Sequence, residues 1–201
     1  MIASLSPGYS LMLHPAHVGH LSVLRALIRD GAVRGGFDRE LATDSREATM
    51  FFSNLRRALT TGYFIEEDPA TGDLTTVAVP GYVYHPDRGG GVSRPVGFGL
   101  FKAIAIGYEL WLTGVDPAWR GVGHGRAMLR ALLGTPPGRR AYVVKVQRFG
   151  RDSPAMAHLL ASCEYTQARQ TVHHSWFVRA DAPSRLAEYV QSPPSAPNAT
   201  H

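Results

Sequence analysis

The sequence predicts a mixed α/β fold in a single domain, with a central sheet flanked by helices. Its 201 residues are enough for one hydrophobic core. Hydrophobic residues make up 44% of the chain and charged residues 18%, which are the proportions of a folded globular protein. A strand, a helix and a second strand are expected in that order over residues 108–146, and this order indicates a parallel βαβ unit.

The first half of the chain is expected to form two helices and three short strands. Apolar side chains at helical spacing predict a helix over residues 17–29, which the glycines within 31–36 are expected to end. A second helix is expected over residues 44–60, with Thr43 or Asp44 as its N-cap. Strands are expected at residues 9–13, 63–67 and 74–79, and a loop at the glycine- and proline-rich segment 85–95.

The second half is expected to complete the sheet and to end in a tail. Strands are expected at residues 96–104, 108–115, 141–146 and 171–178, and helices at residues 123–133 and 154–162. We expect residues 1–180 to form the domain. Residues 181–201 are expected to be a C-terminal tail that is partly disordered, because four prolines lie within the last twenty residues.

The composition excludes several classes of protein. No apolar run approaches the ~20 residues that span a bilayer, and the first residues lack the basic start and apolar core of a secretory signal. Cys163 is the single cysteine, so no internal disulfide can form. The net charge of +5 suits a small anionic ligand but is too dispersed to indicate nucleic acid. We expect a cytoplasmic protein with no membrane partner, no nucleic acid partner and no metal.

The most informative segment runs from residue 108 to residue 126. An apolar strand leads into a proline turn, and Arg120 is followed by glycines at 121, 123 and 125 before a helical pattern begins. Glycines bring backbone N–H groups close to a ligand, and a helix start leaves N–H donors unpaired and partly positive. The segment therefore suits a pyrophosphate, although glycine turns before helices are also common without one. Its spacing matches neither a Walker loop nor a Rossmann fingerprint.

The pattern Val115-x-Pro117-x-x-Arg120-Gly121-x-Gly123-x-Gly125 resembles the motif of the GNAT superfamily of acyl-CoA-dependent N-acyltransferases, an Arg or Gln followed by x-x-Gly-x-Gly/Ala. The order of the expected elements over residues 9–178 is similar as well. The resemblance implies a GNAT-like fold in which two parallel strands splay apart and the co-substrate acetyl-CoA lies in the gap. It implies that the pantetheine arm faces Thr113, Gly114 and Val115. It implies that the pyrophosphate is held by Arg120, Gly121, Val122, Gly123, His124, Gly125 and Arg126.

The resemblance also implies an N-acetyltransferase that moves an acetyl group from acetyl-CoA to a primary amine by direct attack. This reaction needs a base for the amine and a proton source for the departing thiolate. Glu109 lies eleven residues before Arg120, where some family members carry a basic Glu, and it is the candidate catalytic residue. A Glu at the start of a strand is also often only solvated or paired with an arginine.

The segment 153–165 resembles the family's second CoA-contacting helix but departs from it at Ser153, at Leu160 and at Glu164-Tyr165, which stand where Gly-Phe is usual. Ser153 stands where Asn is frequent, and it is expected to cap the helix and to touch the pantetheine. Leu160 stands where members often have the Tyr that protonates the sulfur, and a leucine cannot donate a proton. The acid is therefore a water, another side chain or absent. This departure leaves open a CoA-binding or protein-interaction domain on a GNAT scaffold with little catalysis.

A second motif points to different chemistry. His17-Val18-Gly19-His20 resembles the H-x-G-H motif of nucleotidyltransferases, in which two histidines grip a triphosphate at a helix start. That family also needs a later Ser/Thr-rich segment ending in Arg and a parallel Rossmann sheet, and the sequence favours neither. Nucleotidyl transfer is therefore the weaker alternative.

The acceptor amine is not readable from the sequence. The resemblance places the variable acceptor site on the N-terminal helices and loops, here within residues 31–50 and 80–95. A small-molecule amine and a peptide amine both fit this expectation. The oligomeric state stays open.

Overall fold

The structure of the protein, a computed structural model, describes residues 11–68, 71–86, 93–186 and 190. The strands of its main sheet are β1 (Leu11–Pro15), β4 (Gly81–Pro86), β5 (Gly97–Ile104), β6 (Gly107–Val115), β7 (Ala141–Gln147), β8 (Tyr165–Gln170) and β9 (His174–Arg179). A separate hairpin consists of β2 (Tyr63–Glu67) and β3 (Leu74–Ala78). The helices are α1 (Leu21–Val33), α2 (Arg46–Thr61), α3 (His124–Gly134) and α4 (Ser153–Ala161). Short 3-10 turns are η1 (Val18–His20), η2 (Arg39–Ala42), η3 (Pro117–Trp119) and η4 (Gly138–Arg140).

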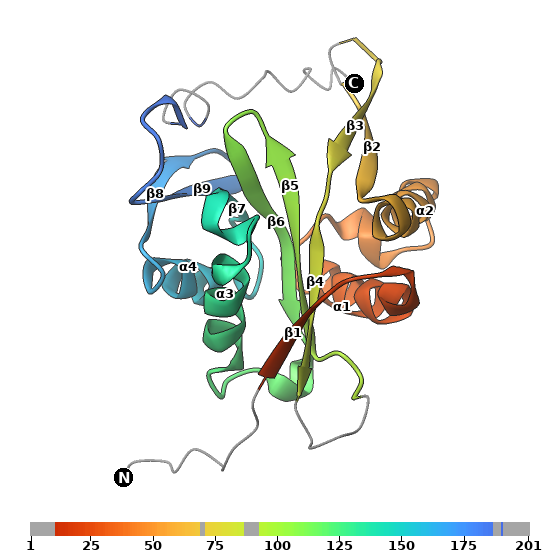
Figure 1. Ribbon diagram of the computed structural model, residues 1–201, viewed down its shortest axis with the longest axis horizontal. Coiled ribbons are helices and arrows are strands. Elements are labelled where there is room, and N and C mark those ends of the chain that lie inside the picture. Colours follow the sequence, from red (N-terminus) through yellow and green to blue (C-terminus); the bar gives the residue numbers. More distant parts are fainter. Residues whose placement is uncertain (1–10, 69–70, 87–92, 187–189, 191–201) are drawn as a thin grey trace.

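The main sheet separates two layers of helices. Its strands lie in the order β1-β4-β5-β6-β7-β9-β8. Helices α1 and α2 cover one face, and α3 and α4 cover the other (Figure 1). Neighbouring strands of this sheet are antiparallel except β6 and β7, which run parallel and are connected through α3. The predicted α/β fold with a βαβ unit over residues 108–146 is therefore confirmed.

Each face of the sheet has its own hydrophobic core. Under α1 and α2, side chains at helical spacing such as Leu24 and Leu55 are fully buried beside strands β5 and β6. Under α3 and α4, Leu129 and Leu160 are buried in the same way. Packing on both faces fixes the positions of β6 and β7, which form the centre of the site described below. Within the described residues, no helix combines the length and the apolar character needed to cross a membrane.

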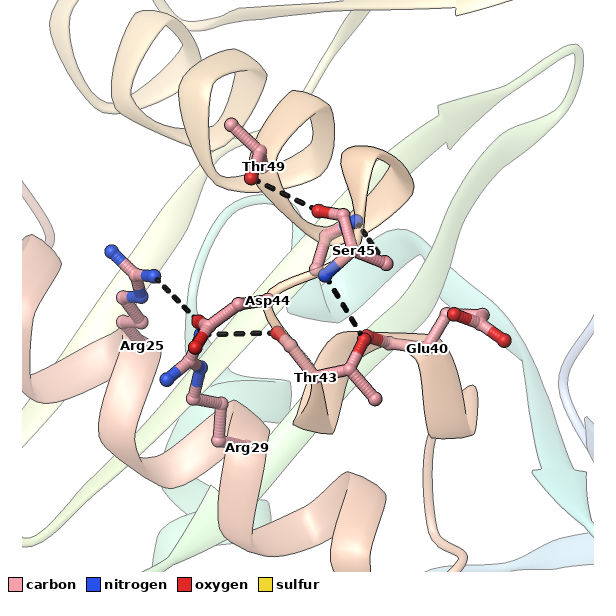
Figure 2. Close-up of polar contacts among 8 residues, drawn as sticks. Arg25, Arg29, Glu40, Thr43, Asp44, Ser45 and Thr49 are labelled. Atoms are coloured by element: carbon pink, nitrogen blue, oxygen red, sulfur yellow. Dashed lines mark hydrogen bonds and ion pairs between the residues drawn. The ribbon is translucent and has the colours of Figure 1, made fainter.

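Polar side chains fix the start of α2, as Figure 2 shows. The hydroxyl of Ser45 accepts a hydrogen bond from the N–H of Ala48 at 3.1 Å, which makes Ser45 the N-cap. The hydroxyl of Thr43 accepts from the N–H of Ser45 at 3.2 Å, and the carboxylate of Asp44 pairs with Arg29 of α1. The predicted cap at Thr43 or Asp44 is therefore wrong, because both side chains have other partners.

Two strands of the sheet were not predicted. β4 occupies residues 81–86, which overlap the start of the predicted loop 85–95, and residues 87–92 of that loop lie outside the described residues. β8 occupies residues 165–170 and exposes most of its polar side chains at the edge of the sheet. β4 lies between β1 and β5, and β8 pairs with β9. Both strands form through long-range pairing, which local sequence patterns do not reveal.

The first helix continues further than predicted. α1 passes through Gly31 and ends at Val33, so the prediction that Gly31 breaks it is wrong. A Cβ at Gly31 would lie 2.4 Å from a ring carbon of Phe37. Gly31 is therefore needed for close packing, since its lack of a side chain lets the Phe37 ring fold back onto the helix.

The two ends of the chain also differ from expectation. β1 begins at Leu11 and extends to Pro15, whereas the strand was predicted over residues 9–13, whose first two residues lie outside the described part. The segment predicted as a tail contributes to the core, because Leu186 and Val190 are 0% and 1% exposed beside Val143 of β7. Residues 187–189 and 191–201 lie outside the described residues.

Candidate active site

Strands β6 and β7 part from each other midway along their length. Their parallel pairing ends at Leu110 and Val144. Beyond this pair, residues 112–115 of β6 stay paired with β5, and residues 145–147 of β7 stay paired with β9. The two strands therefore enclose a V-shaped opening in the sheet. This is the splayed parallel pair that the sequence resemblance implied.

A cleft of about 350 Å³ occupies this opening. Side chains of both strands, of α3 and of α4 form its walls, and the end of α1 borders it as well. Six of the predicted CoA-binding residues line the cleft: Thr113, Gly114, Val115, Arg120, Gly125 and Ser153. The other five belong to the adjoining turn and the first turn of α3 and are not part of the lining: Gly121, Val122, Gly123, His124 and Arg126.

The turn at the end of the cleft has a backbone that favours glycine. Gly121 and Gly123 have φ angles of 81° and 90°, a left-handed conformation in which a side chain is strained. Gly123 is the N-cap of α3, and its carbonyl accepts hydrogen bonds from the next turn of the helix at 3.1 and 3.2 Å. The N–H groups of His124 and Gly125 therefore remain available to a ligand at the positive end of the helix dipole.

Arg120 ties the turn to α1 and α4. Its Nε donates to the carbonyl of Val115 at 2.8 Å, and its Nη2 pairs with Asp30 of α1. Asp152, which precedes α4, binds Arg34 of α1 through both carboxylate oxygens and lies 3.9 Å from Nη1 of Arg120. This Nη1 is buried and has no hydrogen-bond partner among the described residues. Because an unpaired buried donor costs roughly 1–3 kcal/mol, the atom is suited to an anionic ligand.

Glu109 lies at the vertex of the V, one residue before the last β6–β7 pair. The residue is only 6% exposed. Burial raises the pKa of the Glu109 carboxyl, while the charges of Lys145 and Lys102 oppose this rise. Lys102 is the cross-strand partner of Glu109 on β5, and its ammonium pairs with Glu66 of β2 at 2.7 Å. A carboxylate with a raised pKa is a stronger base than an exposed one, so Glu109 is suited to accept a proton.

The two departures in α4 have different outcomes. Ser153 is the first residue of the helix, and its hydroxyl donates to the carbonyl of Gln147. The N-cap is Asp152, without a side-chain cap, so the prediction that Ser153 caps the helix is wrong. Leu160 is 0% exposed in the core beneath α3 and α4. Its position supplies no proton donor.

The histidine motif forms local structure at the start of α1. The Nδ1 of His17 accepts from the N–H of Gly19 at 3.1 Å, and the Nδ1 of His20 accepts from the N–H of His17 at 3.2 Å. The strand before this motif pairs antiparallel with β4, whereas a Rossmann sheet would be parallel. The nucleotidyltransferase alternative therefore lacks the fold that it requires.

A second hollow of about 470 Å³ lies beside the cleft. Residues between Gly35 and Arg39, residues between Gln147 and Gly150, and the two histidines of the β8–β9 hairpin line it. The ring of Phe37 borders both the cleft and the hollow, so the two spaces adjoin there. One of the two predicted acceptor segments, residues 31–50, thus borders this hollow.

Three charged residues of the cleft were not predicted from the sequence: Arg34, Lys145 and Asp152. Asp152 precedes a proline-containing helix start, which is a local signal that could have indicated it. Arg34 reaches the cleft because α1 crosses the sheet, and Lys145 because β7 pairs in one particular register with β9. No local pattern reveals either position.

No family model matches the sequence, and no curated protein sequence matches it. Solved structures do resemble the fold. The PaiA N-acetyltransferase from Thermoplasma acidophilum, in complex with coenzyme A, is 12% identical with a TM-score of 0.56 over 85% of this chain and 98% of that one. The GNAT superfamily phosphinothricin acetyltransferase from Sinorhizobium meliloti, in complex with acetyl-CoA, is 19% identical with a TM-score of 0.52 over 84% and 87%. A mutant of the SpeG spermidine N-acetyltransferase from Vibrio cholerae is 13% identical with a TM-score of 0.53 over 83% and 91%. The chain therefore has the fold of the GNAT superfamily.

Proposed function

We propose that the protein is an N-acetyltransferase that transfers an acetyl group from acetyl-CoA to a primary amine by direct attack. The observation that carries this proposal is the V-shaped opening between β6 and β7. It has a buried carboxylate at its vertex and a glycine-rich helix start at its open end. A long ligand with an anionic end and a reactive end matches these two features.

The cleft suits acetyl-CoA at its anionic end and along its arm. The free N–H groups of His124 and Gly125 and the positive end of α3 favour a pyrophosphate. The buried Nη1 of Arg120 would gain an acceptor if a phosphate oxygen reached it. Strand residues from Thr113 to Val115 and apolar side chains of α3 and α4 line the cleft and suit the pantetheine arm. Glu109 is not one of the lining residues, but it directly precedes Leu110, which is. Two of the solved structures with this fold contain coenzyme A or acetyl-CoA, which supports the proposal.

Glu109 is proposed as the base. A primary amine is protonated near neutral pH, since its pKa is about 10, and only the neutral amine can attack a thioester. Glu109 can accept the proton directly or through a water, and its raised pKa makes it a better acceptor than a solvated carboxylate. Its burial also protects it from pairing with solvent cations.

The acceptor is proposed to enter through the hollow beside the cleft. Phe37 lines both spaces, so an amine that enters the hollow is proposed to pass this side chain to a thioester in the cleft. Asp38 also lines the hollow, and its carboxylate would attract a cationic amine. A small-molecule amine and a peptide amine remain the proposed acceptor classes.

A panel of polyamines, amino acids, peptides and aminoglycosides, assayed for release of free CoA thiol, tests this function. The Glu109→Gln variant should lose ~10²-fold or more in turnover with its best amine, while its affinity for acetyl-CoA stays close to that of the wild type. The matched control is Glu47→Gln on the exposed face of α2, which should keep full turnover. Equal turnover of Glu109→Gln and wild type at neutral pH would remove Glu109 from the mechanism.

The position of Leu160 favours one alternative, a CoA-binding domain with little catalysis. This side chain is buried and carries no proton to donate to a thiolate. The alternative expects tight binding of CoA together with no thiol release for any amine in the panel.

A further inference from the structure

Lysine is used at only two positions in this chain. Of its 21 lysines and arginines, only Lys102 and Lys145 are lysines. Both lie beside Glu109: Lys102 is its cross-strand partner on β5, and Lys145 lies two residues beyond Val143, its neighbour on β7. An arginine never gives up its proton in a protein, whereas a lysine can. Among the lysines and arginines of the chain, the two that can transfer a proton are thus the two next to the candidate base.

The two lysines differ in their surroundings. The Lys102 ammonium is largely buried under β2 and pairs with Glu66 at 2.7 Å. Lys145 is exposed and lines the cleft, and its Nζ lies 5.5 Å from the centre of the Trp176 ring. No carboxylate of the described residues forms an ion pair with Lys145. Its ammonium protons are therefore not held in an ion pair.

The other polar side chains in the lining of the cleft offer no proton to a thiolate. Arg34 and Arg120 are arginines, which keep their protons, and the carboxylate of Asp152 pairs with Arg34, which lowers its pKa. The hydroxyl of Thr113 donates to the carbonyl of Phe98 at 2.9 Å, and that of Ser153 donates to the carbonyl of Gln147. Among the described lining residues, Lys145 is the remaining side chain that can donate a proton.

Lys145 also lies on the correct side of Glu109. Two residues along a strand correspond to about 6.6 Å, and from Val143 to Lys145 this step leads toward the open end of the V. In a thioester that lies along the cleft with its acyl carbon near Glu109, the sulfur is the next atom toward that same end. The sulfur therefore falls on the side of the vertex where Lys145 stands.

We propose that Lys145 is the acid that protonates the departing thiolate of CoA, an inference that rests on the acetyl transfer proposed above. The attacking amine is neutral, because the ammonium proton that Glu109 accepts has passed to solvent before the attack. As the N–C bond forms, the amine passes a second proton to Glu109. The C–S bond breaks, its electron pair goes to sulfur, and the Lys145 ammonium donates a proton to that sulfur. Glu109 then holds one proton and Lys145 lacks one, so a proton transfer through solvent between them restores both groups.

Labelled lysine gives a direct test of this placement. A protein with ¹⁵N or ¹³C at the ε position of lysine should show two side-chain signals, one for each lysine, and Lys102→Met assigns them. Addition of CoA should shift the Lys145 signal and leave the Lys102 signal in place, because only Lys145 lines the cleft. A shift of Lys102 alone, or of neither signal at saturating CoA, would overturn the proposal.

Kinetics then separates proton donation from simple charge. Lys145→Met removes both the charge and the proton, and Lys145→Arg keeps the charge but cannot release a proton. Both variants should lose ~10²-fold or more in turnover with nearly unchanged affinity for acetyl-CoA. The matched control is Arg57→Met on the exposed face of α2, which removes a positive charge away from the cleft and should keep full turnover.

The outcomes distinguish this proposal from the one on which it rests. If Lys145→Arg restores turnover to within a few-fold of the wild type, the acid role is wrong, while a loss in Glu109→Gln in the same assay still supports acetyl transfer. If the wild type binds CoA but acetylates no amine, both proposals are wrong. Loss in both Lys145 variants, with retention in Arg57→Met, is the result that we expect.

Discussion

The helix start at the end of the cleft can be blocked without disturbing the fold, and Gly125 is the position for this change. Gly125 lines the cleft, has no positive φ and belongs to the first turn of α3. An added Cβ would meet Leu159 Cδ2 at 3.9 Å, an ordinary van der Waals distance. Because valine has a higher helix propensity than glycine, Gly125→Val should unfold at a temperature no lower than that of the wild type.

The same variant should bind acetyl-CoA much more weakly. Its side chain extends into the space where we propose that the pyrophosphate approaches the N–H groups of His124 and Gly125. Loss of one hydrogen bond to a charged group costs about 1.5–3 kcal/mol, which corresponds to a roughly 10- to 150-fold rise in the dissociation constant. Titration calorimetry with acetyl-CoA measures this change.

Gly125→Ala is the matched control, since it adds a Cβ that reaches less far into the cleft. It should be at least as stable as the wild type and should bind acetyl-CoA more tightly than Gly125→Val. If Gly125→Val is folded and binds acetyl-CoA as tightly as the wild type, the pyrophosphate does not lie at this helix start, and the placement of the ligand is refuted.

Three further changes test other parts of the structure. Burial raises the pKa of Glu109, so the charged form of this side chain destabilises the folded state. Glu109→Gln should therefore have a higher melting temperature than the wild type at pH 8, and this difference should vanish as the pH falls toward 4.5. An equal difference in melting temperature at both pH values would contradict this. Asp152→Asn should lower the free energy of unfolding, measured in urea, by about 1 kcal/mol, because it removes the negative charge that pairs with Arg34. An unchanged midpoint of urea unfolding would contradict this. Burial and the neighbouring His17, His85 and His14 lower the pKa of His20. The unfolded chain therefore binds a proton at a higher pH than the folded chain does, and the melting temperature should fall as the pH drops below 6.5. His20→Asn should reduce this dependence of melting temperature on pH, and an identical dependence in the variant would refute the role of His20.

Local patterns predicted the elements whose determinants are local. The apolar periodicity of α1, α2 and α3 and the run of glycines before α3 indicated these helices and the turn. Strand β4 escaped prediction because it is short, begins directly after Pro80 and ends at Pro86. It becomes a strand only through its partners β1 and β5 on either side.

The candidate site was predictable in part, because some of its residues are close together in the sequence. Thr113, Val115 and Arg120 were found from a continuous motif, and the structure places them in one cleft. The motif did not show that Arg120 is tied to α1 through Asp30, since that contact spans ninety residues of sequence.

The structure changes the choice of glycine for mutation. From sequence alone, Gly123 is a natural target, because the glycines of this turn are expected to bring backbone N–H groups close to a ligand. A Cβ at Gly123 has no described heavy atom within 4 Å, but its φ of +90° strains any side chain. A loss of binding in a Gly123 variant would therefore mix backbone strain with obstruction, whereas Gly125 separates the two effects.

Thermal unfolding with different ligands measures directly whether the opening between β6 and β7 binds acetyl-CoA. The protein should be melted alone, with CoA, with acetyl-CoA, and with ATP or CTP plus Mg²⁺. A ligand at 100 times its dissociation constant stabilises the folded state by ~2.7 kcal/mol, which is a rise of roughly 5–10 °C for a domain of this size. We expect this rise with CoA and acetyl-CoA, little change with the nucleotides, and a smaller rise for Gly125→Val at the same concentrations. No rise with either CoA species at millimolar concentration, or a rise with nucleotides alone, would contradict this expectation.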